Sequence, residues 1–137
     1  MDITAIAKSV GSFPESRRKE VLILLDELSQ ARARVKSHDD FLSFVREVWP
    51  AFIEGGHHGI MSDAFNRIAD GTLKRLIINM PPRHTKSEFA SHLFPAWYLG
   101  KYPDRKVIQT AHTAELAVGF GRKVRNLVGS ENYQKIF

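Results

Sequence analysis

Residues 73–79 contain a short apolar run, Leu76-Ile77-Ile78, and two consecutive prolines follow shortly after it; this feature constrains the fold more than any other part of the chain. Pro81 and Pro82 lack the amide donor that an α-helix or an inner strand requires, so the chain must turn there. A short apolar run bounded by turn residues is typical of a buried strand. Residues 85–87, Thr-Lys-Ser, then begin a helical pattern. The sequence therefore predicts a strand, a tight turn and a helix in this order.

The residues before this run have helical periodicity. Apolar positions three and four apart predict a first helix from about Pro14, a second beginning within residues 37–40 and a third over residues 58–69. Gly71 is the predicted C-terminal stop of the third helix. We therefore expect residues 1–71 to form a helical N-terminal subdomain.

A second strand and a second helix follow the first pair. The pattern predicts a helix over residues 86–99, a strand over residues 106–111 and a helix over residues 113–128. Alternating strands and helices are typical of a parallel α/β sheet. The predicted fold class is therefore α/β: a P-loop NTPase-like parallel sheet, reduced to a truncated β-α-β-α core over residues 72–137, with the helical subdomain before it.

The turn between the predicted strand and helix has the chemistry of a phosphate-binding loop. Amides at a helix N-terminus surround the phosphates, where the helix dipole favours anions. Lys86 would place its ammonium on the β- and γ-phosphates, and Ser87 would offer its hydroxyl to Mg²⁺. Arg83 would stabilise charge that develops on the transferred phosphoryl group. We predict an ATP–Mg²⁺ site with Arg83 and Lys86 as catalytic residues and Ser87 as the metal ligand. The predicted cofactor-binding residues are Pro82, His84, Thr85, Lys86, Ser87 and Glu88.

The match to the usual phosphate-loop pattern, G-x-x-x-x-G-K-[ST], is imperfect. Met80 and Thr85 occupy the positions of the two glycines. A β-branched residue is disfavoured at left-handed φ, so we expect the loop to differ locally from the glycine form. A second interpretation is that Thr85 merely starts a helix, with Glu88 completing a capping box. The strand, the Pro-rich turn and the second strand–helix unit favour phosphate binding.

Composition narrows the class of protein. With 137 residues, a formal net charge of +5 and 43% hydrophobic residues, the chain is typical of one globular domain with either an anionic partner or a solvated basic surface. The absence of cysteine excludes disulfides and thiolate metal sites. No apolar run approaches the roughly 20 residues of a membrane span, and no secretory signal pattern is visible. We therefore expect a soluble, cytoplasmic protein with no membrane contact.

Several ordered motifs resemble the large terminase subunit of tailed bacteriophages. The resemblance covers roughly residues 40–137, and the segments that carry it are residues 74–88, 94–100, 114–117, 120–127 and 133–137. Members of this family often have glycine at the position of Thr85. The similarity implies the ATP-binding, N-terminal part of a motor that threads double-stranded viral DNA into a capsid.

The resemblance also implies partners and further contacts. The partners would be double-stranded DNA, the terminase small subunit, the portal protein and other copies of the chain in a ring, in the cytoplasm of the host cell. An adenine-contacting segment is expected near residues 49–58. Trp49 or Phe52 would stack on the base, and His57 or His58 would bond its edge.

Two acidic motifs that the whole enzyme needs do not follow Ser87. A P-loop ATPase orients Mg²⁺ and water with acids at the end of an apolar strand, and a two-metal nuclease needs a carboxylate cluster. The later acids, Glu88, Asp104, Glu115 and Glu131, fit neither pattern. We therefore expect an N-terminal fragment with an incomplete ATPase domain and no nuclease domain, which hydrolyses ATP poorly by itself.

Two other functions stay open. A fragment of another nucleic-acid translocase, such as a helicase-like ATPase, would share the loop, although the order of motifs after residue 88 argues against it. A non-catalytic module in which the helical half docks on a protein is compatible with the missing acidic motif.

Overall fold

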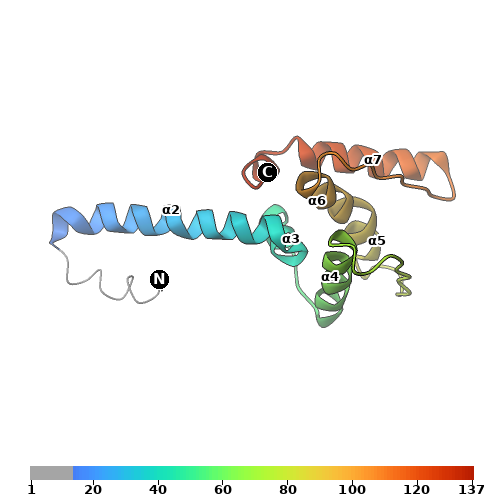
Figure 1. The fold of residues 1–137 in the computed structure, drawn as a ribbon, viewed down its shortest axis with the longest axis horizontal. Helices are drawn as coiled ribbons and strands as arrows, with labels where there is room; N and C mark the ends of the chain where they lie inside the picture. Colours follow the sequence, from blue (N-terminus) through green and yellow to red (C-terminus); the bar gives the residue numbers. More distant parts are fainter. Residues whose placement is uncertain (1–13) are drawn as a thin grey trace. The chain divides into compact units, whose positions relative to one another are not determined.

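The computed structural model describes residues 14–137, and every regular element in this range is a helix (Figure 1). Helices make up 66% of these residues. In chain order they are α2 (Glu15–Asp39), α3 (Phe41–Val48), α4 (Gly56–Ala69), α5 (Lys86–Glu88), the π-helical turn η2 (Phe89–Leu93), α6 (Phe94–Lys101), α7 (Ala114–Val128) and α8 (Glu131–Gln134). None of the described helices combines the length and the apolar character needed to cross a membrane.

The chain divides into two compact units between Val35 and Lys36, inside α2. In the first unit, α2 leaves Leu22, Ile23 and Leu24 more than half exposed. Every residue of the predicted site belongs to the second unit, Lys36–Phe137.

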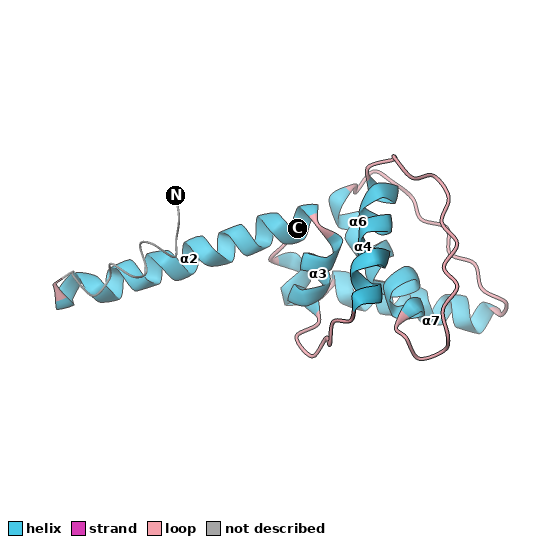
Figure 2. Cartoon of the chain, turned by 90° about the horizontal axis from the view of Figure 1, so that it is seen from below, coloured by secondary structure: helices cyan, strands magenta, loops and turns pink. Residues whose placement is uncertain are grey.

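The predicted α/β fold class is wrong for this structure. No parallel sheet occurs within residues 14–137, and the expected strands at residues 73–79 and 106–111 are loops (Figure 2). A strand is stable only beside a neighbour whose backbone amides and carbonyls pair with its own, and no backbone hydrogen bond joins these two segments. Burial nevertheless alternates along the first: Leu76 and Ile78 pack against the core, whereas Ile77 is 86% exposed. One face of this extended segment therefore packs on the core, and the segment belongs to no sheet.

A hydrogen-bonded cap joins α3 to α4. The Asp40 carboxylate accepts bonds from the amide and the hydroxyl of Ser43, at 2.8 and 2.6 Å, which starts α3. Asn66 of α4 donates to the other carboxylate oxygen and accepts from the amide of Phe41, both at 2.9 Å. Partial burial raises the pKa of Asp40, but the bonds from Ser43 and Asn66 outweigh it and hold the pKa below its ordinary value.

The predicted helices of the second unit are confirmed. α4 covers the third predicted helix, and Gly71 takes φ +82° just after it, as expected of a glycine stop. α7 covers the last long helix and begins where the Thr113 hydroxyl accepts a bond from the amide of Leu116. Both helices were readable because their periodicity and their terminal residues are local features of the sequence.

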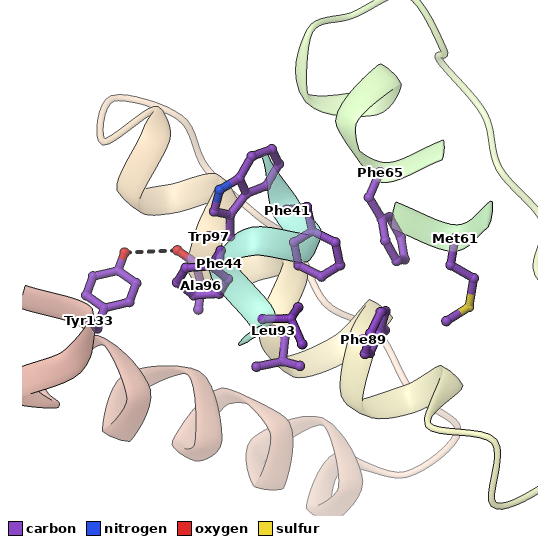
Figure 3. Close-up of a cluster of buried hydrophobic side chains, with 10 residues drawn as sticks. Phe41, Phe44, Met61, Phe65, Phe89, Leu93, Ala96, Trp97 and Tyr133 are labelled. Carbon is purple, nitrogen blue, oxygen red and sulfur yellow. Dashed lines mark hydrogen bonds between the residues drawn. The ribbon is translucent and has the colours of Figure 1, made fainter. Parts of the chain in front are cut away.

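The core of the second unit is built around Phe41 (Figure 3). Phe41 is fully buried, and its ring centroid lies 5.2 to 5.9 Å from those of Phe65, Phe89, Phe94 and Trp97. Aromatic pairs at such spacings contribute roughly 0.5–1.5 kcal/mol each beyond the area that they bury. The cluster therefore holds α3, α4 and the helix that follows the predicted loop in one packed body.

Two buried side chains fasten other segments to α6. The indole nitrogen of Trp97 donates to the carbonyl of Ser37 at 3.1 Å. The hydroxyl of Tyr133 on α8 donates to the carbonyl of Ala96 at 2.9 Å (Figure 3). Each bond satisfies a polar group that is costly to bury alone, so the end of α2 and α8 have defined positions against α6.

α5, η2 and α6 are one continuous helix with a wide turn, since the residues at their junctions keep helical dihedral angles. The amide of Phe94 bonds the carbonyl of Phe89, five residues earlier. Pro95 has no amide to donate to the carbonyl of Ser91, which instead accepts a bond from the side chain of Gln109 at 2.8 Å. The proline accounts for the wide turn, and Gln109 supplies the missing donor.

Candidate phosphate-binding loop

Residues 80–88 line an open concavity of about 610 Å³. All the predicted cofactor-binding residues and Arg83 are on this lining. Small-molecule sites commonly have volumes of about 300–1,000 Å³. The residues predicted from the sequence therefore line one concavity, with the first turn of the helix at residues 86–101 as part of its wall.

Two residues of the loop adopt left-handed backbone conformations although neither is glycine. Arg83 has φ 66° and Thr85 has φ 58°. This conformation costs roughly 1–2 kcal/mol for a residue with a Cβ, and it persists only where the surroundings compensate. Thr85 therefore takes the left-handed conformation despite its β-branched side chain, and the expected local difference from the glycine form stays a prediction.

His84 closes the turn around Arg83. Its ring Nδ1 donates to the carbonyl of Pro82 at 2.9 Å, across the left-handed residue. This bond compensates part of the strain at Arg83 and leaves the guanidinium on the exposed side of the loop. Arg83 is therefore accessible to solvent.

The Thr85 hydroxyl is held on both sides. It donates to the carbonyl of His84 at 2.6 Å and lies 2.6 Å from Nε2 of His58 on α4. The other ring nitrogen of His58, Nδ1, accepts a bond from the amide of Gly55 at 2.8 Å. Sequence reasoning missed this link, since 27 positions separate His58 from Thr85 and no motif connects them.

The capping-box interpretation of Thr85 and Glu88 is wrong. Thr85 does occupy the N-cap position of α5, but its side chain forms no capping bond. The carboxylate of Glu88 is bonded to His92 and Lys123. The first amides of the helix therefore receive no side-chain cap from these residues and stay available to an anion at the concavity.

Lys86 lies across the loop that it belongs to. Its ammonium donates to the carbonyl of Met80 at 3.3 Å, a long and weak bond. Within residues 14–137 no carboxylate lies within ion-pair distance of Lys86. Ser87 is exposed at the same wall. Among the described residues, the ammonium of Lys86 is therefore held by a weak carbonyl contact alone, and Ser87 lines the same concavity.

Glu88 faces the side of the helix that carries His92 and α7. Its carboxylate is 2.9 Å from Nδ1 of His92 and forms an ion pair with Lys123. Burial raises the pKa of Glu88, but the bonds from Lys123 and His92 outweigh it and lower the pKa overall. Glu88 therefore fastens α5 to α7, and its charge is paired with that of Lys123. The pair with His92, four residues later on the helix, follows a spacing that a sequence can reveal.

The expected adenine contacts lie beside the loop, and they differ in availability. Phe52 packs against Trp49, His58 and Phe89, with ring centroids 4.7 to 5.5 Å apart. His58 is 4% exposed and both its ring nitrogens are bonded, so it has no free edge for a base. His57 lines a neighbouring concavity of about 280 Å³, and its Nε2 has no hydrogen-bond partner. Contact between His57 and a base stays a prediction.

The donor set of the loop fits a phosphate better than a metal held by protein alone. In the described part of the chain, no three His, Asp or Glu side chains come together as metal ligands. Mg²⁺ commonly keeps several waters and binds through substrate phosphates, so a single hydroxyl such as that of Ser87 is compatible with it.

Comparisons of the chain with protein-family models, with curated proteins and with solved structures found no match.

Proposed function

We propose that this chain binds ATP–Mg²⁺ through residues 80–88, as the N-terminal ATPase portion of a viral terminase large subunit. One observation carries the proposal: the uncapped start of the helix at residues 86–101, the ammonium of Lys86 and the hydroxyl of Ser87 line the same open concavity. Helix N-termini favour anions through free amides and the helix dipole. The family is proposed from the motifs of the sequence, and the helical fold of residues 14–137 adds no support to it.

The proposed roles follow from the positions of the side chains. Lys86 would leave the carbonyl of Met80 and bind the β- and γ-phosphates. Ser87 would contribute its hydroxyl to Mg²⁺, and Arg83 would offset charge that develops during phosphoryl transfer. Bound Mg²⁺ supplies further neutralisation of the phosphate oxygens.

In the full enzyme, the energy of hydrolysis would move double-stranded viral DNA into the capsid. The proposed partners are the terminase small subunit, the portal protein and further copies of the chain in a ring. The proposed location is the host-cell cytoplasm. The net charge of +5 is compatible with an anionic partner.

Isothermal titration calorimetry with Mg-ATP tests the proposal. Lys86→Ala is expected to weaken binding at least about 100-fold, because charge-assisted bonds to phosphate contribute roughly 1.5–3 kcal/mol each and Lys86 would form more than one. Lys135→Ala is the matched control, since it removes the same charge from an exposed residue outside the concavity. Equal affinity of the two variants would end the phosphate-loop hypothesis.

A further inference from the structure

We propose that His58 is a positioning residue for the loop: its Nε2–H group holds the Thr85 hydroxyl and thereby keeps Thr85 in the left-handed conformation. The inference concerns the shape of the loop, and its consequence for a nucleotide rests on the proposed function. It also gives a reason why threonine can replace glycine at this position.

The donors and acceptors available fix the direction of each hydrogen bond in the series from Gly55 through His58 and Thr85 to His84. The amide of Gly55 can only donate, so Nδ1 of His58 must accept and carries no hydrogen. The hydrogen of the neutral ring is then on Nε2, which donates to Oγ1 of Thr85. The hydroxyl hydrogen of Thr85 in turn points to the carbonyl of His84. Every donor finds an acceptor, so these three hydrogen bonds form one continuous relay, a hydrogen-bonded series that runs from the start of α4 to the loop.

The surroundings of His58 favour this neutral form. Burial of the ring lowers the pKa of His58, and the adjacent His57 lowers it further, while the carboxylate of Glu54 opposes both effects. A protonated ring would carry hydrogens on both nitrogens and could no longer accept the bond from Gly55. Neutral His58 with hydrogen on Nε2 is therefore the form that satisfies all its neighbours.

Packing prevents the ring from turning away. The centroid of His58 lies 4.7 Å from that of Phe52 and 4.9 Å from that of Phe89. Phe89 is fully buried, and its amide bonds the carbonyl of Thr85 at 2.9 Å. The histidine ring contacts the side chain of Phe89 and the carbonyl of Thr85 bonds its amide, so the same buried residue holds both.

The strained backbone of Thr85 explains why loss of the hydrogen bond from His58 should change the shape of the loop. A β-branched residue at φ 58° is disfavoured, so without its hydroxyl bonds it should return to negative φ. A glycine at the same position needs no such support. The loop is therefore expected to depend on His58 when residue 85 is threonine and to be independent of His58 when it is glycine.

The tautomer of His58 gives the first test. Nitrogen-15 NMR of the free protein near pH 7 is expected to show hydrogen on Nε2 and a bare Nδ1. A ring with hydrogen on Nδ1, or a fully protonated ring, would overturn the relay. This measurement requires no nucleotide, so it separates the inference from the proposed function.

A double-mutant cycle gives the second test. His58→Phe keeps a ring against Phe52 and Phe89 and removes both nitrogens, whereas His58→Gln keeps a donor near the position of Nε2. In the threonine background, His58→Phe is expected to move the amide resonances of residues 84–86 and to weaken Mg-ATP binding about tenfold, the effect of one good hydrogen bond. His58→Gln should restore most of the affinity. In the Thr85→Gly background, His58→Phe should change the affinity by less than about twofold.

The cycle distinguishes positioning from a general loss of structure. Circular dichroism of each variant shows whether the helices persist. An equal loss on His58→Phe in the threonine and glycine backgrounds would refute the link to the Thr85 hydroxyl. If wild-type protein does not bind Mg-ATP, the proposed function fails, and the resonances of residues 84–86 in the same variants still decide the inference.

Discussion

Gly100→Ala is expected to destabilise the protein although alanine favours helices, because α6 and the C-terminal residues approach each other closely at this glycine. A Cβ on Gly100 would lie 2.5 Å from the hydroxyl oxygen of Tyr133 and 2.6 Å from ring atoms of Phe137. Tyr133 is 5% exposed and bonded to the carbonyl of Ala96, so it cannot retreat without losing that bond. Something in this contact must therefore move.

The expected change in the free energy of unfolding combines one stabilising contribution with two destabilising ones. Replacing glycine by alanine in a helix contributes about 0.5–1 kcal/mol of stability. Overpacking costs about 1–3 kcal/mol, and loss of the Tyr133 hydrogen bond costs about 0.5–1.5 kcal/mol more. Gly100→Ala should therefore lower the free energy of unfolding by about 0.5–4 kcal/mol.

Gly121→Ala is the matched control on α7, where a new Cβ would meet nothing within 4 Å. It should raise stability by about 0.5–1 kcal/mol. Urea unfolding followed by circular dichroism measures both variants, and unchanged m-values would show that only stability differs. If Gly100→Ala is as stable as Gly121→Ala, the packing of α8 and the C-terminal residues on α6 is not as described.

Two further outcomes are expected. The isolated chain should hydrolyse Mg-ATP slowly in a phosphate-release assay, because Glu88, the acid on the concavity, is engaged by Lys123 and His92; brisk turnover would reveal another acid that completes the site. Stability should fall in acid, because Asp40 and Glu88 have folded-state pKa values below their ordinary 3.8 and 4.5, so the unfolded chain binds more protons as the pH drops through this range. The stability that these two carboxylates contribute is fully present above about pH 5 and is lost as the pH falls through their lowered folded-state pKa values. Urea unfolding midpoints at several pH values would show this loss. Glu88→Gln should make the midpoint depend less steeply on pH.

Local features of the sequence carried most of the helical prediction. The periodicity before Gly71 and the capping residue Thr113 act within a few positions, and the structure has helices at those places. The α/β prediction failed because a strand is defined by a partner, and a short apolar run within residues 73–79 cannot supply one. Such a run also occurs when one face of an extended segment packs on helices, as Leu76 and Ile78 do.

The candidate site, too, could be predicted from the sequence only in part. Residues 82–88 are contiguous, so a motif could group them, and they line one concavity. The relay through His58 joins α4 to the loop across 27 positions, and no pattern in a single sequence predicts such a contact. The left-handed conformation of Thr85 was missed for the same reason, since propensity argues against it and the compensation comes from a distant residue.

The most direct measurement is a titration of nitrogen-15-labelled protein with Mg-ATP, followed through the backbone amide resonances. Phosphate bound at the start of the helix should shift the amides of residues 84–88 most strongly and in a saturable way, and tripolyphosphate with Mg²⁺ should reproduce most of these shifts. Absence of saturable shifts, or shifts confined to residues outside 80–88, would contradict the assignment of this loop as a phosphate site.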